Sequence, residues 1–309
     1  MLGAWAISGR GEDAISILEG IKNSFSNVEY IACNKDGTVD FQEIKSIAEK
    51  SEIIVAVVGE TREMSGEASS RSHISLPLYD EELLKELYKT GKPVVAVLVN
   101  GRPLAIPWVA ENIPAILEAW HGGIETGNAV AEILLGKYNP SGKLTVTFPQ
   151  STGACPCYYN HPSTGRPGGK SKFTSKYLDI SINPVYSFGH GLSYTNYNYS
   201  NFKAEICEDQ LKASVTVDNS GEMDGEEIIQ LYIQDVSARR VRPVKELKAF
   251  KKVLLKKEQS ERVTFTIPII DLGYYDSNMN YIVEEGKFKI YVGKSSKEVL
   301  EAEVLLKNK

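Results

Sequence analysis

The side chains best suited to chemistry lie just after residues 53–58. Residues 53–58 are uniformly apolar and rich in β-branched side chains, which is typical of a strand covered on both faces in a parallel sheet. The loop that follows carries three carboxylates and two arginines: Glu60, Glu63, Glu67, Arg62 and Arg71. Carboxyl groups can donate or accept protons in catalysis. Because open α/β sheets bind ligands at the carboxyl ends of their strands, we predict that this loop forms the functional site of the protein.

The elements that position this loop alternate between helix and strand through residues 1–150. Apolar side chains at helical spacing predict helices over residues 14–21, 41–48, 83–88 and 129–134. Short apolar runs predict strands over residues 28–33, 53–58, 94–99, 115–118 and 144–148. This alternation indicates βαβ units, and therefore an α/β sandwich with a mostly parallel sheet and helices on both faces.

Polar or aromatic residues follow three successive predicted strands. Glu67 and Arg71 follow the first, Arg102 follows the second, and Trp120 and His121 follow the third. Parallel strands end at one edge of their sheet, so we expect these side chains to converge there.

The last third of the sequence changes to a period of two. Alternating runs lie at residues 211–217, 229–233, 263–267, 288–292 and 300–306. About seven short strands in such a pattern predict an immunoglobulin-like sandwich. We see no catalytic constellation in it and expect a structural role. The predicted organisation is an α/β domain over residues 1–150, a long connecting loop over 151–196 and an all-β domain over 197–309.

Three stretches resemble one known family. The loop Met64-Ser65-Gly66-Glu67-Ala68-Ser69-Ser70-Arg71-Ser72, after a strand that ends in Gly59-Glu60, resembles the acid/base loop of glycoside hydrolase family 3, the β-glucosidases and β-xylosidases. Residues 118–149 and 186–195 resemble the same family. The resemblance implies a retaining mechanism, with an aspartate nucleophile from a TIM barrel, a proton donor from the following α/β domain, and a fibronectin type III-like domain after it.

The resemblance also implies roles for individual residues. It places Glu67 in the position of the general acid/base that acts on terminal β-glucosyl or xylosyl groups. Glu60 is the second choice, either as the acid or as a partner for an arginine. Substrate contacts are expected from Arg71, Trp120, His121 and Tyr159. From the residues alone, a solvated carboxylate, an orienting ion pair and a core tryptophan remain open as alternatives, and Arg102 is expected to be structural.

The main departure from the family is that this sequence contains no counterpart of the catalytic barrel. Its aspartate nucleophile has no counterpart in this sequence, and the first strand of the α/β domain is also expected to be missing. We therefore expect a truncated enzyme, inactive unless a family 3 barrel is supplied in trans. A non-catalytic carbohydrate-binding or scaffold protein is an alternative. So is a hydrolase that uses Glu60 and Glu67 as its own carboxylate pair.

The resemblance implies a β-glucoside or β-linked oligosaccharide as the partner, and composition argues against two other classes of partner. A net charge of −5 without a basic run argues against nucleic acid, and no apolar run reaches the ~20 residues that span a bilayer. The glycines of residues 120–127 do not form a dinucleotide fingerprint. The four cysteines and four histidines show no metal-ligand spacing, so we predict no metal and no cofactor. As written, the N-terminus predicts a cytoplasmic protein, although a signal peptide would belong to the missing half.

Overall fold

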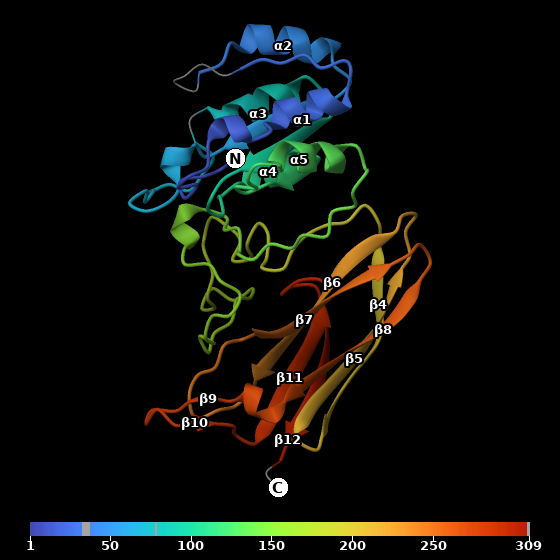
Figure 1. Cartoon of the computed structure of the whole chain (residues 1–309). Helices are drawn as coiled ribbons and strands as arrows, with labels where there is room; N and C mark the ends of the chain where they lie inside the picture. The colour runs from blue at the N-terminus through green and yellow to red at the C-terminus, as the bar shows by residue number, and fades with distance from the viewer. Residues whose placement is uncertain (33–37, 78, 308–309) are drawn as a thin grey trace. The chain divides into compact units, whose positions relative to one another are not determined.

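The computed structural model describes residues 1–32, 38–77 and 79–307 (Figure 1). Its internal contacts divide the chain into two compact units. The first unit comprises Met1–Tyr138 and Phe148–Cys155, and the second comprises Asn139–Thr147 and Pro156–Lys309. The chain therefore passes between the two units more than once.

A parallel sheet of three strands forms the centre of the first unit. The strands are β1 (Ile54–Gly59), β2 (Val94–Val99) and β3 (Ala115–Glu118), in the order β1-β2-β3. β1 pairs with β2 and β2 with β3, both in parallel. The carboxyl ends of all three strands consequently meet at one edge, as their apolar sequences predict.

Helices cover both faces of this sheet (Figure 1). They are α1 (Ile17–Ser24), α2 (Phe41–Lys50), α3 (Asp80–Lys89), α4 (Pro107–Asn112) and α5 (Thr126–Leu134), with short 3-10 turns at Gly11–Asp13, Arg62–Met64 and Thr152–Ala154. Ile17 of α1 and Val130 of α5 pack on Val97 of the sheet. α3 packs on β1 and β2, where the alternate residues Ala96 and Leu98 are buried. The predicted α/β sandwich is confirmed.

Two of the predicted strands are wrong. Among the described residues 28–32 there is no strand, and most of them are exposed, because the sheet ends at β1; Cys33 lies outside the described residues. Residues 144–148 also form no strand of this sheet. The backbone of this segment pairs instead with residues 189–190. Leu144 N–H donates to His190 O at 2.7 Å, and Gly189 N–H donates to Leu144 O at 2.7 Å.

The second unit contains the predicted sandwich. One sheet has the strand order β12-β11-β6-β7 and the other has the order β4-β5-β8. Their bounds are β4 (Tyr197–Cys207), β5 (Gln210–Asn219), β6 (Gly225–Asp235), β7 (Glu246–Leu255), β8 (Ser260–Pro268), β11 (Gly286–Gly293) and β12 (Val299–Leu306). A 3-10 turn (Ile269–Leu272) and a small pair, β9 (Tyr274–Tyr275) and β10 (Tyr281–Ile282), complete the unit. Alternate side chains such as Val215, Leu231 and Ile290 are fully buried in its core.

Residues 139–147 attach to this sandwich through a buried ion pair. Lys143 Nζ lies 3.1 Å from Glu227 Oε2, with side-chain exposures of only 9% and 2%. Tyr199 donates its hydroxyl to the other oxygen of Glu227 at 2.9 Å, and Lys143 also donates to Gly191 O at 2.8 Å. A polar group this deep is stable only because each of its charges has a partner.

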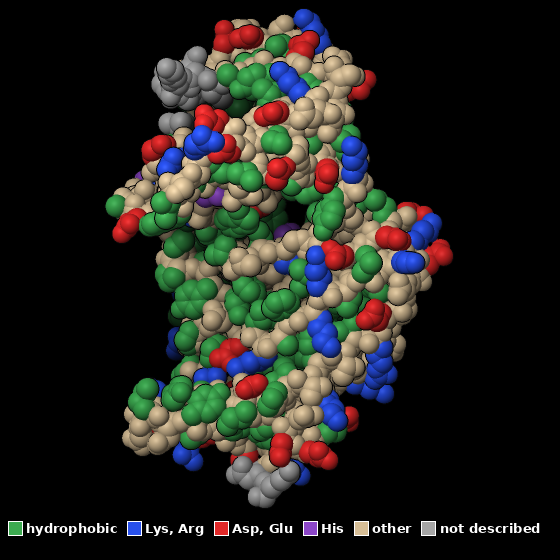
Figure 2. All heavy atoms as spheres, in the orientation of Figure 1, with side chains coloured by type: hydrophobic (Ala, Val, Ile, Leu, Met, Phe, Trp, Pro, Cys, Tyr) green, Lys and Arg blue, Asp and Glu red, His purple; other side chains and the backbone are tan. Residues whose placement is uncertain are grey.

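The surface carries both signs of charge. Figure 2 shows Lys and Arg side chains interspersed with Asp and Glu over the face that it draws. Among the described side chains of that face there is no continuous basic stripe of the kind that binds nucleic acid.

Candidate active-site loop

Glu60 lies at the centre of the polar network at the sheet edge. It follows β1 directly, its side chain has no exposed surface, and Oε1 lies 2.9 Å from Arg71 Nη1 and 2.8 Å from Arg102 Nε. Its other oxygen accepts the Gly101 N–H at 3.2 Å. Both oxygens of Glu60 are therefore used within the protein, which argues against Glu60 as a proton donor.

Arg102 links this carboxylate to the loop. Its Nη2 donates to Ser69 O at 2.8 Å and also to Met64 O. These two carbonyls lie at the two ends of residues 64–69, the part of the acid/base loop that contains Glu67. Arg71 differs, since it donates to Ser75 O at 3.1 Å, beyond the end of that loop.

Glu67 lies on the exposed side of the acid/base loop. Within the part of the chain that the structure describes, its carboxylate has neither a hydrogen-bond partner nor an ion pair. The backbone around it is unusual, with φ of +128° at Gly66 and +58° at Ala68. A left-handed conformation at alanine costs energy and persists only where the surroundings enforce it.

His121 lies close to the base of this loop. A Cβ placed on Gly101 would meet Ser65 Oγ at 1.9 Å and His121 Nε2 at 2.9 Å, so only glycine fits between them. Burial lowers the pKa of His121, and both of its ring nitrogens are buried without a hydrogen-bond partner among the described residues. The N-terminal segment covers the ring, because a Cβ on Gly3 would meet His121 Cδ2 at 2.8 Å.

Trp120 turns away from the strand into a left-handed conformation with φ of +49°. Its ring contacts Phe148 with centroids 5.9 Å apart. Its backbone N–H donates to Glu118 Oε1 at 3.0 Å. Glu118 also accepts a 3.4 Å hydrogen bond from Asn100. Burial raises the pKa of Glu118 to about 7, against the hydrogen bonds from Trp120 and Asn100, which lower it.

Tyr159 belongs to the second unit. Its ring stacks on Phe188 with centroids 4.3 Å apart and meets Tyr232 edge-on at 5.7 Å. Its hydroxyl accepts the Leu247 N–H at 3.3 Å. The structure thus brings Glu60, Arg71 and His121 together in the first unit and gives Tyr159 a packing role on the sandwich.

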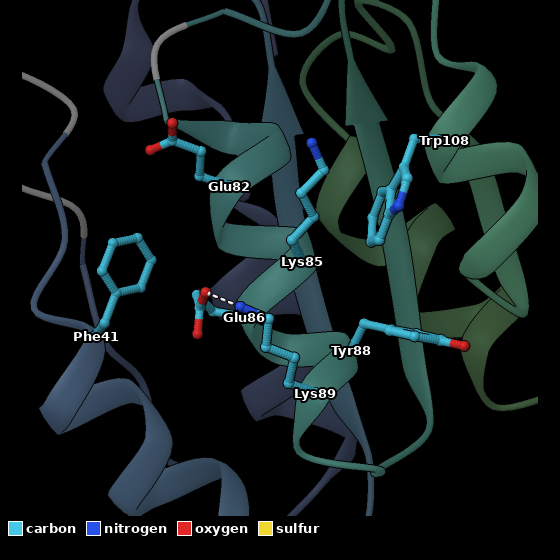
Figure 3. Close-up of a pocket in the computed structure, with 7 residues that line it drawn as sticks. All are labelled: Phe41, Glu82, Lys85, Glu86, Tyr88, Lys89 and Trp108. Atoms are coloured by element: carbon cyan, nitrogen blue, oxygen red, sulfur yellow. Dashed lines mark hydrogen bonds and ion pairs between the residues drawn. The ribbon is translucent and has the colours of Figure 1, made fainter.

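A separate pocket of about 470 Å³ lies between α2, α3 and α4 (Figure 3). Phe41, Tyr88 and Trp108 line it, with four charged residues of α3: Glu82, Lys85, Glu86 and Lys89. None of the residues predicted for the site lines this pocket.

Sequence reasoning found most of these positions but missed two of them. Asn100 is fully buried behind the loop, and Glu118 is the only described glutamate with a pKa raised to about 7. Both end or follow predicted strands at the same edge, which was the available signal. Among the described residues, no three His, Cys, Asp or Glu side chains cluster as metal ligands, and no helix is long and apolar enough to cross a membrane.

The arrangement can present one carboxyl group to a ligand on a braced loop. It does not supply a second free carboxylate beside Glu67, since the ion pairs with Arg71 and Arg102 occupy Glu60. Glycoside hydrolysis needs an acid together with a nucleophile or base. The described loop therefore provides half of such a pair.

Comparisons with known proteins agree with this picture. The model of the glycosyl hydrolase family 3 C-terminal domain matches residues 1–194, and that of the fibronectin type III-like domain matches residues 227–296. The periplasmic beta-glucosidase of Salmonella typhimurium is 39% identical over 97% of this chain, which spans 43% of that enzyme. The beta-xylosidase of Formosa agariphila is 37% identical over 92% of this chain and 40% of its own length.

Solved structures give the same result. The beta-glucosidase of Listeria innocua in complex with isofagomine superposes with a TM-score of 0.94 at 38% identity, over 98% of this chain and 44% of that one. A mutant of the same enzyme has been solved with laminaribiose, and the enzyme itself with glucose. The chain spans less than half the length of these relatives. It belongs to glycoside hydrolase family 3, of which it carries the C-terminal domain and the fibronectin type III-like domain.

Proposed function

We propose that this chain supplies the general acid/base of a retaining β-glucosidase-type active site and that the acid/base is Glu67. The observation that carries the proposal is the exposed, unpartnered carboxylate of Glu67 on a loop whose two ends are fixed to the sheet edge. The nucleophile would come from a family 3 barrel supplied in trans. The substrate would be a terminal β-glucoside or β-xyloside, as the names of the relatives suggest.

The exposure of this carboxylate fits a site completed by docking. A glycosidase acid must hold its proton near neutral pH, and desolvation is one way to raise the pKa of a glutamate that far. A barrel seated over the acid/base loop would remove water from the carboxyl group. Alone, the chain has an acid without a nucleophile, and we expect no turnover.

The test is hydrolysis of aryl β-glucoside and β-xyloside by the purified chain, with and without a separately expressed family 3 barrel. We expect activity only with the barrel. Glu67→Gln should reduce kcat by about 10² to 10⁴, because hydrolysis of the glycosyl-enzyme needs this carboxylate as a base whatever the leaving group. Glu63→Gln is the matched control, because Glu63 is an exposed glutamate of the same segment and should leave the rate unchanged.

Other outcomes would replace this proposal. Saccharide binding that is insensitive to Glu67→Gln, without hydrolysis in any mixture, would favour a non-catalytic carbohydrate-binding or scaffold protein. Turnover by the chain alone would favour a complete site within it, although the ion pairs of Glu60 argue against a Glu60 and Glu67 pair. The expected cytoplasmic location stays a prediction, and the relative named periplasmic gives it no support.

A further inference from the structure

We propose that Arg102 is a positioning residue for the acid/base loop, with Glu60 as the group that orients it. The inference deepens the proposed function and rests on it for its catalytic meaning. It assigns to Arg102 the task of keeping residues 64–69 in the one conformation that presents Glu67 outward.

The first support is the placement of the two hydrogen bonds. A single nitrogen, Arg102 Nη2, donates to Ser69 O at 2.8 Å and to Met64 O. These carbonyls stand on either side of Glu67. One guanidinium group therefore joins the start of the loop to its end, and no other described side chain does this.

The second support is the rigidity of the arginine itself. Arg102 Nε lies 2.8 Å from Glu60 Oε1, and that carboxylate has no exposed surface. Glu60 is fixed in turn by the Gly101 N–H at 3.2 Å and by Arg71 at 2.9 Å. The contact with Glu60 is an ion pair, since Arg102 Nε has no hydrogen-bond partner among the described residues. A planar guanidinium that is held beside a buried carboxylate and also donates to two carbonyls through Nη2 has little freedom to turn.

The third support is the conformation that the bridge encloses. Gly66 and Ala68, on either side of Glu67, both have positive φ, of +128° and +58°. Glycine adopts a positive φ without strain, but the left-handed backbone at Ala68 is strained and relaxes when the contacts that enforce it are removed. Without the bridge, the loop would sample other conformations, and Glu67 would spend less time in the outward one. Catalytic groups lose rate steeply with small displacements.

The conservative variant Arg102→Lys tests the bridge in the chain alone. Lysine keeps the charge beside Glu60 but cannot reach the carboxylate and both carbonyls at once. A glutamate-specific protease cuts after Glu67 only when the loop opens, and it also cuts after Glu52, an exposed residue of the same unit outside the loop. We expect Arg102→Lys to raise the ratio of cleavage at Glu67 to cleavage at Glu52 by about fivefold or more, because local opening becomes easier.

Two matched variants separate the bridge from charge and from general loosening. Arg62→Lys changes an exposed arginine of the same segment, and Arg71→Lys changes the other partner of Glu60, which does not donate to the acid/base loop. Arg62→Lys should leave the ratio within about twofold of the unaltered chain, and Arg71→Lys should raise it clearly less than Arg102→Lys does, because it loosens Glu60 without removing the bridge. An unchanged ratio in Arg102→Lys, or an equal rise in Arg71→Lys, would overturn the proposal.

The catalytic consequence is read in the mixture with a barrel. A misplaced acid/base should lower kcat/KM by about tenfold or more for a glucoside with a poor leaving group and little for an activated aryl glucoside, because kcat/KM reports the first step, in which only the poor leaving group needs the proton. Equal losses of kcat/KM on both substrates would overturn the positioning role. If the unaltered chain gives no activity with any barrel, the proposed function fails while the proteolysis result still decides whether the bridge holds the loop.

Discussion

The Nε atom of Arg102 forms an ion pair at 2.8 Å with Oε1 of Glu60, a carboxylate with no exposed surface. The same oxygen accepts a hydrogen bond from Arg71. The two arginines have side-chain exposures of 21% and 19%. One buried carboxylate is therefore shared by two guanidinium groups that are themselves mostly buried.

Glu60→Ala should strongly destabilise the first unit. It leaves two guanidinium groups without their carboxylate, and breaking a buried pair from one side costs about 3 to 5 kcal/mol. All three tryptophans, Trp5, Trp108 and Trp120, lie in this unit, so tryptophan fluorescence during urea unfolding reports on it alone. Glu63→Gln, at an exposed site, should change the unfolding free energy by less than about 0.5 kcal/mol. A loss below about 1 kcal/mol in Glu60→Ala would contradict the importance of this pair.

Gly101→Ala should displace Ser65 and loosen the acid/base loop. The new Cβ would lie 1.9 Å from Ser65 Oγ and 2.9 Å from His121 Nε2, and overpacking of this kind costs about 1 to 3 kcal/mol. Gly11→Ala is the control, because nothing lies within 4 Å of its Cβ. Urea unfolding followed by tryptophan fluorescence compares the two variants. Equal unfolding free energies would show that the space between Ser65 and His121 accommodates the added methyl group, which would contradict this prediction.

Lys143→Met should destabilise the second unit and leave the first unchanged. The substitution leaves the carboxylate of Glu227, a residue that is 1% exposed, without its lysine partner, at a cost of about 3 to 5 kcal/mol. The double variant Lys143→Met with Glu227→Gln should recover most of that loss, because the glutamine still accepts the Tyr199 hydroxyl. Calorimetry measures the unfolding of the second unit, and tryptophan fluorescence checks the first. A single variant as destabilised as the double one would argue that packing around Lys143, and not the charge of Glu227, dominates.

Local patterns in the sequence predict the elements but not their long-range partners. The apolar runs of β1, β2 and β3 and the spacing of α2 and α3 locate these elements within a few residues. The run at residues 144–148 looks the same in sequence, yet Leu144 pairs with Gly189 and His190, far along the chain. β7 was missed because lysines such as Lys251 and Lys252, which are both exposed although their side chains point to opposite faces of the strand, obscure the alternation.

The site shows the same limit. That polar residues would gather at one sheet edge follows from strand direction, and the structure places Glu60, Gly101 and His121 there. Which arginine Glu60 would bind does not follow, since Arg62 is the nearest in sequence and Arg71 lies further along the same loop. Arg62 is exposed, whereas Arg71 and the still more distant Arg102 both contact Glu60, because the path of the loop decides which guanidinium reaches the buried carboxylate.

The pH dependence of the first unit should reflect Glu118. Burial raises the pKa of Glu118 from 4.5 to about 7, so the folded chain binds more protons than the unfolded chain between these values. Stability is therefore highest at low pH within this window and falls as the pH rises toward 7, by up to about 3 kcal/mol from this residue. Asp80, whose pKa burial raises from 3.8 to about 6, acts in the same direction.

Glu118→Gln should remove the part that Glu118 contributes. The neutral amide matches the protonated carboxyl group, so the variant should equal the unaltered chain near pH 5 and exceed it in stability near pH 7.5. Urea unfolding followed by tryptophan fluorescence at both pH values measures the difference, and Glu111→Gln, on the exposed side of α4, should behave as the unaltered chain does. A Glu118→Gln variant with the unaltered pH dependence would mean that Glu118 is ionised in the folded chain throughout this range, with Trp120 N–H and Asn100 outweighing its burial.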